Sequence, residues 1–243
     1  MVTTPVIFLP GSLCDKRVFA DQLREIDQPC EVADLTLDDS IMAMATRVLR
    51  EAPQRFALVG LSLGGIVAAE IARLASERVQ AMALIDTNLG AADDAQLRTR
   101  RRWVTDVRAG HFAQVVEELV PVLTASPDAH GPLIVDMATA VGPAGFLRQN
   151  DALLHRRDQR SIISRFQGPI LIAYGSDDQL CPPSVHADLS ACCADARLLV
   201  VEQAGHLSSI DQPVALTSGL TDWLEDVKNN QTKRRTTHES ANA

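Results

Sequence analysis

Short, continuous apolar runs recur along the chain, separated by longer segments in which apolar residues return every three or four positions. The short runs are typical of buried strands, and the longer pattern is typical of helices that bury one face. Strands are predicted at residues 6–9, 32–34, 56–59, 79–86, 170–174 and 197–201, and helices at 17–26, 40–51, 66–75, 184–192 and 214–227. This alternation predicts an α/β protein with a mostly parallel sheet of about six strands, flanked by helices on both faces.

The alternation stops between residues 90 and 160, where only helical patterns occur, at 96–107, 111–123, 133–141 and 144–154. Breaks are expected at Gly110, at Pro127, at the pair Gly131 and Pro132, and at the pair Gly142 and Pro143. A helical insert between two strands predicts a cap over the carboxyl edge of the sheet. The expected core domain therefore comprises residues 1–89 and 161–227, and the polar residues 228–243 predict a disordered tail.

The length of 243 residues suits one α/β domain with an insertion. The net charge of −8 argues against general affinity for nucleic acid. We expect no membrane association and a cytoplasmic location, because the sequence has neither a signal-peptide pattern nor a run of about twenty apolar residues. Five cysteines without a CxxC pair predict neither a disulfide framework nor a zinc site, and Cys14 and Cys181 are expected to pack in loops.

The most informative stretch surrounds Ser62 in the sequence GLSLGG, which follows the predicted strand 56–59 and precedes the helix 66–75. A serine on a tight turn between a strand and a helix has its hydroxyl pushed out of the turn. Side chains two residues before and after it would collide with the backbone, which explains Gly60 and Gly64. Ser62 is therefore predicted to be a nucleophile, rather than a serine in a chance match to G-x-S-x-G.

A base and an acid are expected after other strands, because the carboxyl ends of parallel strands share one edge of the sheet. His206 follows the strand 197–201 and is the predicted general base. The loop after 170–174 offers Asp177 and Asp178, and Asp86 follows 79–86 as a third acid candidate. Such an acid would fix the tautomer of the imidazole, and we favour Asp178.

The same edge is expected to provide an oxyanion hole. The backbone N–H of Leu63, at the start of the helix, points where a negative oxygen would form. A second donor is predicted from the backbone of Ser12, in the loop Pro10-Gly11-Ser12-Leu13 after the first strand.

Four segments together resemble the α/β-hydrolase superfamily: LPGS, GLSLGG, GSDDQLCPP and AGHLSSIDQP. The resemblance covers residues 2–227 and implies the α/β-hydrolase fold of a compact, esterase-like member with a helical cap. In that family the acid is the third residue after the glycine of a G-x-x-D-x-x-x-P segment, which corresponds to Asp178. One departure is Pro10, where many relatives carry histidine.

The resemblance implies a serine hydrolase that cleaves carboxylic esters through an acyl-enzyme intermediate, without a metal or cofactor. Hydrolysis of enol-lactones or of carbon–carbon bonds, and acyl transfer, are alternatives that use the same triad. A non-catalytic ligand-binding protein of this fold is an alternative of a different class, which an intact triad disfavours.

The predicted partner is a small ester-like molecule, and the chain is expected to be a monomer or homodimer. The substrate is expected between cap and sheet. Trp103, Phe112, Met137 and Phe146 are candidates for the pocket, although ordinary helix packing is the alternative for each. The basic run 98–102 is interpreted as a solvated helix face, with contact to an acidic substrate as the alternative. His111, His130, His155 and His186 lack metal-site spacing and are expected on the surface.

Overall fold

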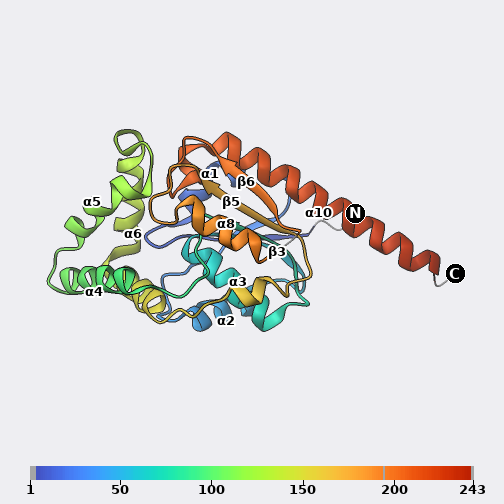
Figure 1. Ribbon diagram of the computed structural model, residues 1–243, viewed down its shortest axis with the longest axis horizontal. Coiled ribbons are helices and arrows are strands. Elements are labelled where there is room, and N and C mark those ends of the chain that lie inside the picture. Colours follow the sequence, from blue (N-terminus) through green and yellow to red (C-terminus); the bar gives the residue numbers. More distant parts are fainter. Residues whose placement is uncertain (1–3, 194, 242–243) are drawn as a thin grey trace.

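The computed structural model describes residues 4–193 and 195–241, with side chains up to Asn229. Within these residues a six-stranded sheet runs through the molecule in the order β2–β1–β3–β4–β5–β6, and each neighbouring pair is parallel (Figure 1). The strands are β1 (Val6–Leu9), β2 (Cys30–Val32), β3 (Phe56–Leu61), β4 (Val79–Ile85), β5 (Ile170–Gly175) and β6 (Arg197–Val201). The predicted α/β class and parallel sheet are confirmed.

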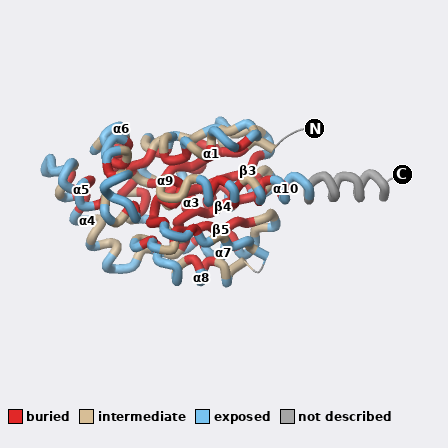
Figure 2. Tube along the Cα trace, turned by 90° about the horizontal axis from the view of Figure 1, so that it is seen from above, coloured by how far each residue is buried: buried red, intermediate tan, exposed pale blue. Residues whose placement is uncertain are grey.

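Helices cover both faces of the sheet because its strands are apolar on both sides. In β1, Val6 and Phe8 join one buried cluster, and Ile7 and Leu9 join the other. The first face packs against α1 (Ala20–Glu25), preceded by the short 3-10 helix η1 (Lys16–Phe19), and against α10 (Pro213–Ala241). The second face packs against α2 (Ile41–Glu51), α3 (Leu63–Ala75), α7 (Arg160–Ile163) and α8 (Pro183–Ala191). Figure 2 shows the buried residues concentrated along the strands between these layers.

Three further helices lie together at one end of the sheet: α4 (Asp94–Arg108), α5 (Phe112–Leu123) and α6 (Pro127–Leu154) (Figure 1). They are the helices predicted for the cap, while the domain division itself remains a prediction. The break expected at Gly131 and Pro132 is wrong, because α6 continues through both residues. Pro132 is the sixth residue of α6, so its missing N–H costs the helix one backbone hydrogen bond, to the carbonyl of Asp128, and the helix continues despite this loss. The second expected break is present as a kink at Gly142, which has a φ of 70°.

The C-terminal helix differs from the sequence prediction. The backbone of α10 continues to Ala241, whereas the helix was predicted to end at residue 227 and a disordered tail to follow over 228–243. The sequence after residue 227 contains neither glycine nor proline, so nothing in it ends a helix that has begun. Residues 242 and 243 lie outside the described part. Within the described residues, no helix is both long enough and apolar enough to cross a membrane.

The order of the strands creates a crevice at one position. The chain passes from β1 outward to β2, then crosses over to β3 on the other side of β1. Ligands of open parallel sheets bind outside the carboxyl ends of the strands at such a reversal. The loops after β1 and β3 meet there, since a Cβ added to Gly11 would lie 3.5 Å from the Cβ of Ser62.

Candidate active site

Ser62 occupies the sharp turn between β3 and α3. Its φ of 53° and ψ of −113° are strained for a residue with a side chain. A Cβ at Gly60 would lie 2.5 Å from the carbonyl oxygen of Gly64, and a Cβ at Gly64 would lie 1.9 Å from that of Leu9. The steric explanation for the two glycines is therefore confirmed, because the turn closes against backbone atoms that cannot move aside.

This crowding leads to a prediction for the variant Gly64→Ala. The new methyl group would force apart β1 and the start of α3, so we expect the free energy of unfolding to fall by about 3 kcal/mol or more. Gly131→Ala is the matched control: its Cβ would lie 3.3 Å from Val120 Cγ1, and alanine favours the helix, so we expect a change within about 1 kcal/mol. Urea denaturation of both variants measures the difference, and equal midpoints would show that the turn tolerates a side chain.

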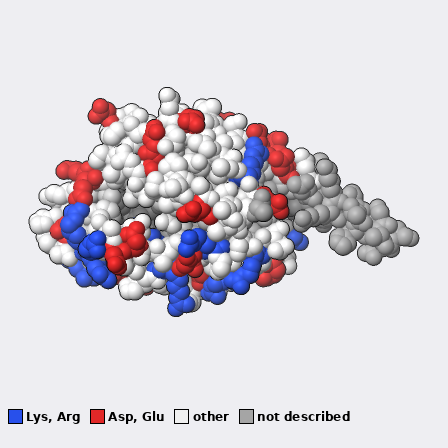
Figure 3. All heavy atoms as spheres, viewed as in Figure 1, with Lys and Arg blue, Asp and Glu red and all other residues white. Residues whose placement is uncertain are grey.

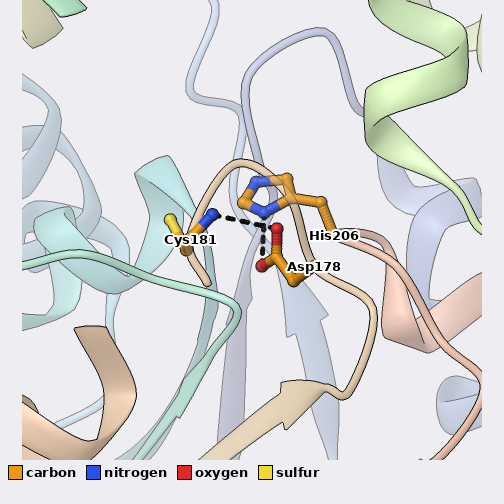
Figure 4. Close-up of side chains that lie close together, drawn as sticks. All are labelled: Asp178, Cys181 and His206. Atoms are coloured by element: carbon orange, nitrogen blue, oxygen red, sulfur yellow. Dashed lines mark hydrogen bonds and ion pairs between the residues drawn. The ribbon is translucent and has the colours of Figure 1, made fainter. Parts of the chain in front are cut away.

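Ser62, His206 and Asp178 form a continuous hydrogen-bonded series. Ser62 Oγ lies 2.8 Å from His206 Nε2, and His206 Nδ1 lies 2.9 Å from Asp178 Oδ2. The histidine and aspartate are buried, while the serine lines a cavity. The other carboxylate oxygen of Asp178 accepts hydrogen bonds from the backbone N–H groups of Leu180 and Cys181, at 2.8 and 2.9 Å. Figure 4 shows this carboxylate between the imidazole ring and the backbone nitrogen of Cys181.

The two other acid candidates do not contact the imidazole. Asp177 is exposed, with its carboxylate 3.3 Å from the hydroxyl of Ser176. Asp86 is fully buried and accepts hydrogen bonds from the backbone N–H of Gly175 (2.8 Å) and from the hydroxyl of Ser208 (2.6 Å). Burial, and then the negative charge of Asp178, raise the pKa of Asp86 to about 7. Asp86 therefore ties together the loops that carry the other groups.

The electrostatic environment of His206 is dominated by two opposing effects. Burial by itself lowers the pKa of an imidazole, because it disfavours the charged form. The Asp178 carboxylate opposes burial through its charge and its hydrogen bond, and the resulting pKa of His206 lies well above 6.5. The site is thus built to hold a proton on this ring once the ring has received one.

The predicted oxyanion donors are the backbone N–H groups of Ser12, in the loop after β1, and of Leu63, next to Ser62 in the chain. Ser12 lines the same cavity as Ser62, and Leu63 is the first residue of α3. Among the described residues, no hydrogen bond is recorded from the backbone N–H of either residue. Both donors are therefore available to an oxygen atom placed beside Ser62, and their role as an oxyanion hole remains a prediction.

Gln149, which the sequence analysis did not single out, holds the loop after β1 in place. This fully buried side chain on α6 accepts hydrogen bonds from the Ser12 hydroxyl (3.1 Å) and from the backbone N–H of Leu13 (3.0 Å). Leu13 has a φ of 63°, an unusual conformation for leucine that this contact supports. The signal available in the sequence is the polar pair Gln149 and Asn150 within a largely apolar helix, and both side chains are fully buried.

A cavity of about 370 Å³ lies over Ser62 and His206, between the sheet edge and helices α4, α5 and α6. Trp103 and Phe146, two of the predicted pocket residues, line it. The other two do not: Phe112 packs against Phe146, with ring centroids 5.9 Å apart, and Met137 is fully buried in the core. The periodicity of the helices marked these residues as buried but could not show which neighbour each would meet.

The remaining cysteines and histidines have mostly structural surroundings. Cys14 is buried in its loop, as predicted, and Cys181 lines the cavity. Among the described side chains, Asp178, Cys181 and His206 have potential metal-ligand atoms within 4.8 Å of one another. A metal ion there would compete with the hydrogen bond between Asp178 and His206. The expectation that His186 lies on the surface is wrong, since it is fully buried and stacks on Tyr174 at 4.5 Å.

The arrangement of the chain is similar to that of solved hydrolase structures. A thermophilic esterase from Thermogutta terrifontis aligns with a TM-score of 0.83, covering 93% of this chain and 91% of that chain at 23% identity. The enol-lactonase from Burkholderia xenovorans LB400 aligns with a TM-score of 0.79, covering 93% of this chain and 92% of that chain at 19% identity. At these identities the likeness is one of fold.

At the level of sequence, one curated relative is the pimeloyl-acyl-carrier protein methyl ester esterase of Neisseria meningitidis serogroup C, 26% identical over 123 residues. That match includes 49% of this chain and 48% of the relative, so the chain spans about half the length of the curated relatives it matches. A model of the alpha/beta hydrolase family matches residues 6–218, from the first strand into the last helix. This span contains the Ser62 turn, Asp178 and His206, and the chain belongs to the alpha/beta hydrolase family.

Proposed function

We propose that this protein is a serine hydrolase that cleaves carboxylic esters through an acyl-enzyme intermediate. The observation that carries the proposal is the continuous series of hydrogen bonds from Ser62 Oγ through both ring nitrogens of His206 to Asp178. A serine hydroxyl is a weak nucleophile until a neighbouring base accepts its proton. The series supplies that base, orients it and stabilises the positive charge that it acquires.

In the first half of the reaction, Ser62 Oγ attacks the carbonyl carbon of the ester and its proton passes to His206 Nε2. The carbonyl oxygen becomes negative and accepts hydrogen bonds from the backbone N–H groups of Ser12 and Leu63, aided by the N-terminus of α3. The tetrahedral intermediate collapses, the bond to the alcohol oxygen breaks, and the leaving alcohol takes the proton from His206.

In the second half, a water molecule loses a proton to His206 and attacks the acyl carbon on Ser62. The acid is released, and the proton returns to Ser62 Oγ. The esterases among the relatives support ester cleavage as the net reaction. Enol-lactone hydrolysis, carbon–carbon bond hydrolysis and acyl transfer would use the same groups and differ in the substrate or in the acceptor that replaces water.

Labelling with a fluorophosphonate, combined with hydrolysis of a short p-nitrophenyl ester, tests this proposal. We expect a covalent adduct on the peptide that contains Ser62, and ester turnover that disappears as the adduct accumulates. Mass spectrometry locates the adduct, and unmodified Ser164, an exposed serine, is the internal control. If the protein neither hydrolyses the ester nor reacts with the probe, the result would favour a ligand-binding role for this fold.

A further inference from the structure

Two arginines line the cavity that contains Ser62 and His206, and neither pairs with a carboxylate of the described residues. Arg100 extends from α4, and Arg156 follows the end of α6. Among the described residues, no ion pair is recorded for either guanidinium. The sequence pattern of the run 98–102 favoured a solvated helix face, and for Arg100, which lines the cavity, that prediction is wrong.

Arg102, an arginine on the surface of the same helix, behaves differently. Arg102 is exposed and pairs with Glu118 and Asp106. Figure 3 likewise shows basic side chains gathered along the lower edge of the molecule with acidic ones among them. Arg100 and Arg156 differ from Arg102 because they are partly buried and, within the described part of the chain, form no ion pair with a carboxylate.

Neutral groups hold both guanidinium groups in place. Arg100 donates to Asn150 Oδ1 at 3.1 Å, and its guanidinium carbon lies 6.0 Å from the centre of the Trp103 ring. Asn150 is fully buried and is itself anchored by a 3.0 Å hydrogen bond to the carbonyl of Phe146. Arg156 donates to Gln96 Oε1 at 2.8 Å and to the carbonyl of Gly90 at 3.1 Å. A guanidinium has five N–H donors, so Arg100 in particular retains unused donors.

The positive charges of Arg100 and Arg156 are electrostatically unfavourable in this cavity, which indicates that a bound anion would compensate them. Burial and the neighbouring charge of Arg156 lower the pKa of Arg100 to about 10. Burial also lowers the pKa of Arg156, which Asp93 attracts without forming an ion pair. Two like charges in a partly desolvated cavity repel each other, and a bound anion would remove most of that cost.

We propose that Arg100 and Arg156 form an anion subsite that selects esters carrying a free carboxylate in addition to the ester to be cleaved. A planar guanidinium binds a carboxylate with two parallel hydrogen bonds, which gives it both affinity and orientation. Both arginines line the same cavity as Cys181, whose sulfur lies within 4.8 Å of a ring nitrogen of His206. The subsite therefore adjoins the reacting groups, and the inference rests on the proposed ester hydrolysis.

The apolar part of the cavity separates the two ends of such a substrate. Trp103, Leu119 and Phe146 line it alongside Ser12 and Ser62. A methylene chain would pack against these side chains, while its carboxylate reaches the arginines and its ester reaches Ser62. The substrate class is thus the half esters of dicarboxylic acids.

The test compares monomethyl esters of glutaric and adipic acid with the corresponding methyl ester amides, which replace the carboxylate with a neutral group of the same shape. We expect the kcat/KM of the half ester to exceed that of the ester amide in the unmodified protein. Arg100→Gln should reduce the ratio of the two values by on the order of 10- to 100-fold, as expected for loss of a charged hydrogen-bonding partner. Arg101→Gln, the same change at the adjacent exposed residue, should leave the ratio unchanged.

The outcomes separate this inference from the proposed function. Turnover of both substrates with a ratio that Arg100→Gln does not alter would overturn the anion subsite and leave the ester hydrolase intact. Absence of turnover for both, with no fluorophosphonate labelling at Ser62, would overturn the proposed function.

Calorimetry with glutarate then tests the subsite by itself, in Ser62→Ala protein with and without Arg100→Gln. Binding weakened at least tenfold by Arg100→Gln supports the anion subsite even without turnover. Equal dissociation constants for the two proteins contradict it.

Discussion

Replacing Ser62 with alanine should lower the kcat for ester hydrolysis by on the order of 10⁶-fold, the scale seen when other serine hydrolases lose their nucleophile. The change removes one hydroxyl, whose recorded contact is the 2.8 Å hydrogen bond to His206 Nε2. Without it no acyl-enzyme can form, and the remaining groups can only bind the substrate and polarise its carbonyl. Initial rates with a p-nitrophenyl ester measure the loss.

The fold should remain nearly unchanged in this variant. The start of α3 is held by the carbonyl oxygen of Ser62, which accepts from the N–H groups of Gly65 and Ile66, and alanine retains that oxygen. Serine and alanine both carry a Cβ, so the strained backbone conformation at this position costs about the same free energy with either residue. Ser164→Ala, which removes an exposed hydroxyl, is the matched control for activity. A Ser62→Ala protein that kept a tenth of the activity would contradict the proposed nucleophile.

The features that the sequence predicts well are those decided locally. The inner strands β1, β3, β4 and β5 are covered on both faces and are therefore apolar at consecutive positions, which is why short apolar runs located them. The edge strands β2 and β6 are partly exposed, and β2 lies about two residues before its predicted position. The turn at Ser62 is equally local, because Gly60 and Gly64 are required by atoms within a few residues and one neighbouring strand. Parallel pairing then brings the loops that carry Ser62, Asp178 and His206 to one edge without further information.

The features that the sequence did not predict depend on contacts between distant residues. Gln149 meets Leu13 across 136 positions, and Arg100 meets Asn150 across 50. A helical pattern distinguishes the buried face of α4 from its exposed face, yet it does not show that Arg100 faces a cavity while Arg102 faces Glu118. The stacking of His186 on Tyr174 could not be predicted either, because a single histidine in a polar segment gives no sign that it is buried.

Asp178→Asn should lower kcat by on the order of 10⁴-fold, the loss seen when a comparable triad of another protein is changed in this way. The surroundings of Asp178 determine how the new amide is oriented. Two backbone N–H groups, from Leu180 and Cys181, point at Oδ1, so the amide oxygen must occupy that position. The amide nitrogen then faces His206 Nδ1, where the carboxylate oxygen Oδ2 accepted a hydrogen bond.

That orientation reverses the tautomer of His206. An amide nitrogen donates to Nδ1, so the ring proton moves to Nε2, and Nε2 can no longer accept the proton of Ser62. Asp177→Asn is the matched control, because it makes the same chemical change at the adjacent, exposed residue. We expect its rates to remain within about twofold of the unmodified protein, as surface changes usually have small effects. Equal losses in the two variants would show that Asp178 does not act through the imidazole.

The pH dependence provides a second, independent test of the same contact. The neutral imidazole is the active form, so kcat/KM in the unmodified protein should fall as the pH drops through the pKa of His206, which Asp178 holds well above 6.5. Removing the negative charge removes the effect that opposes burial, and the pKa of His206 then falls. The residual activity of Asp178→Asn should therefore persist to lower pH, whereas Asp177→Asn should keep the original profile. If Asp178 had a purely structural role, replacing it would lower the rate without shifting the pH at which kcat/KM falls. Only the charge and the hydrogen bond of Asp178 act on the imidazole proton.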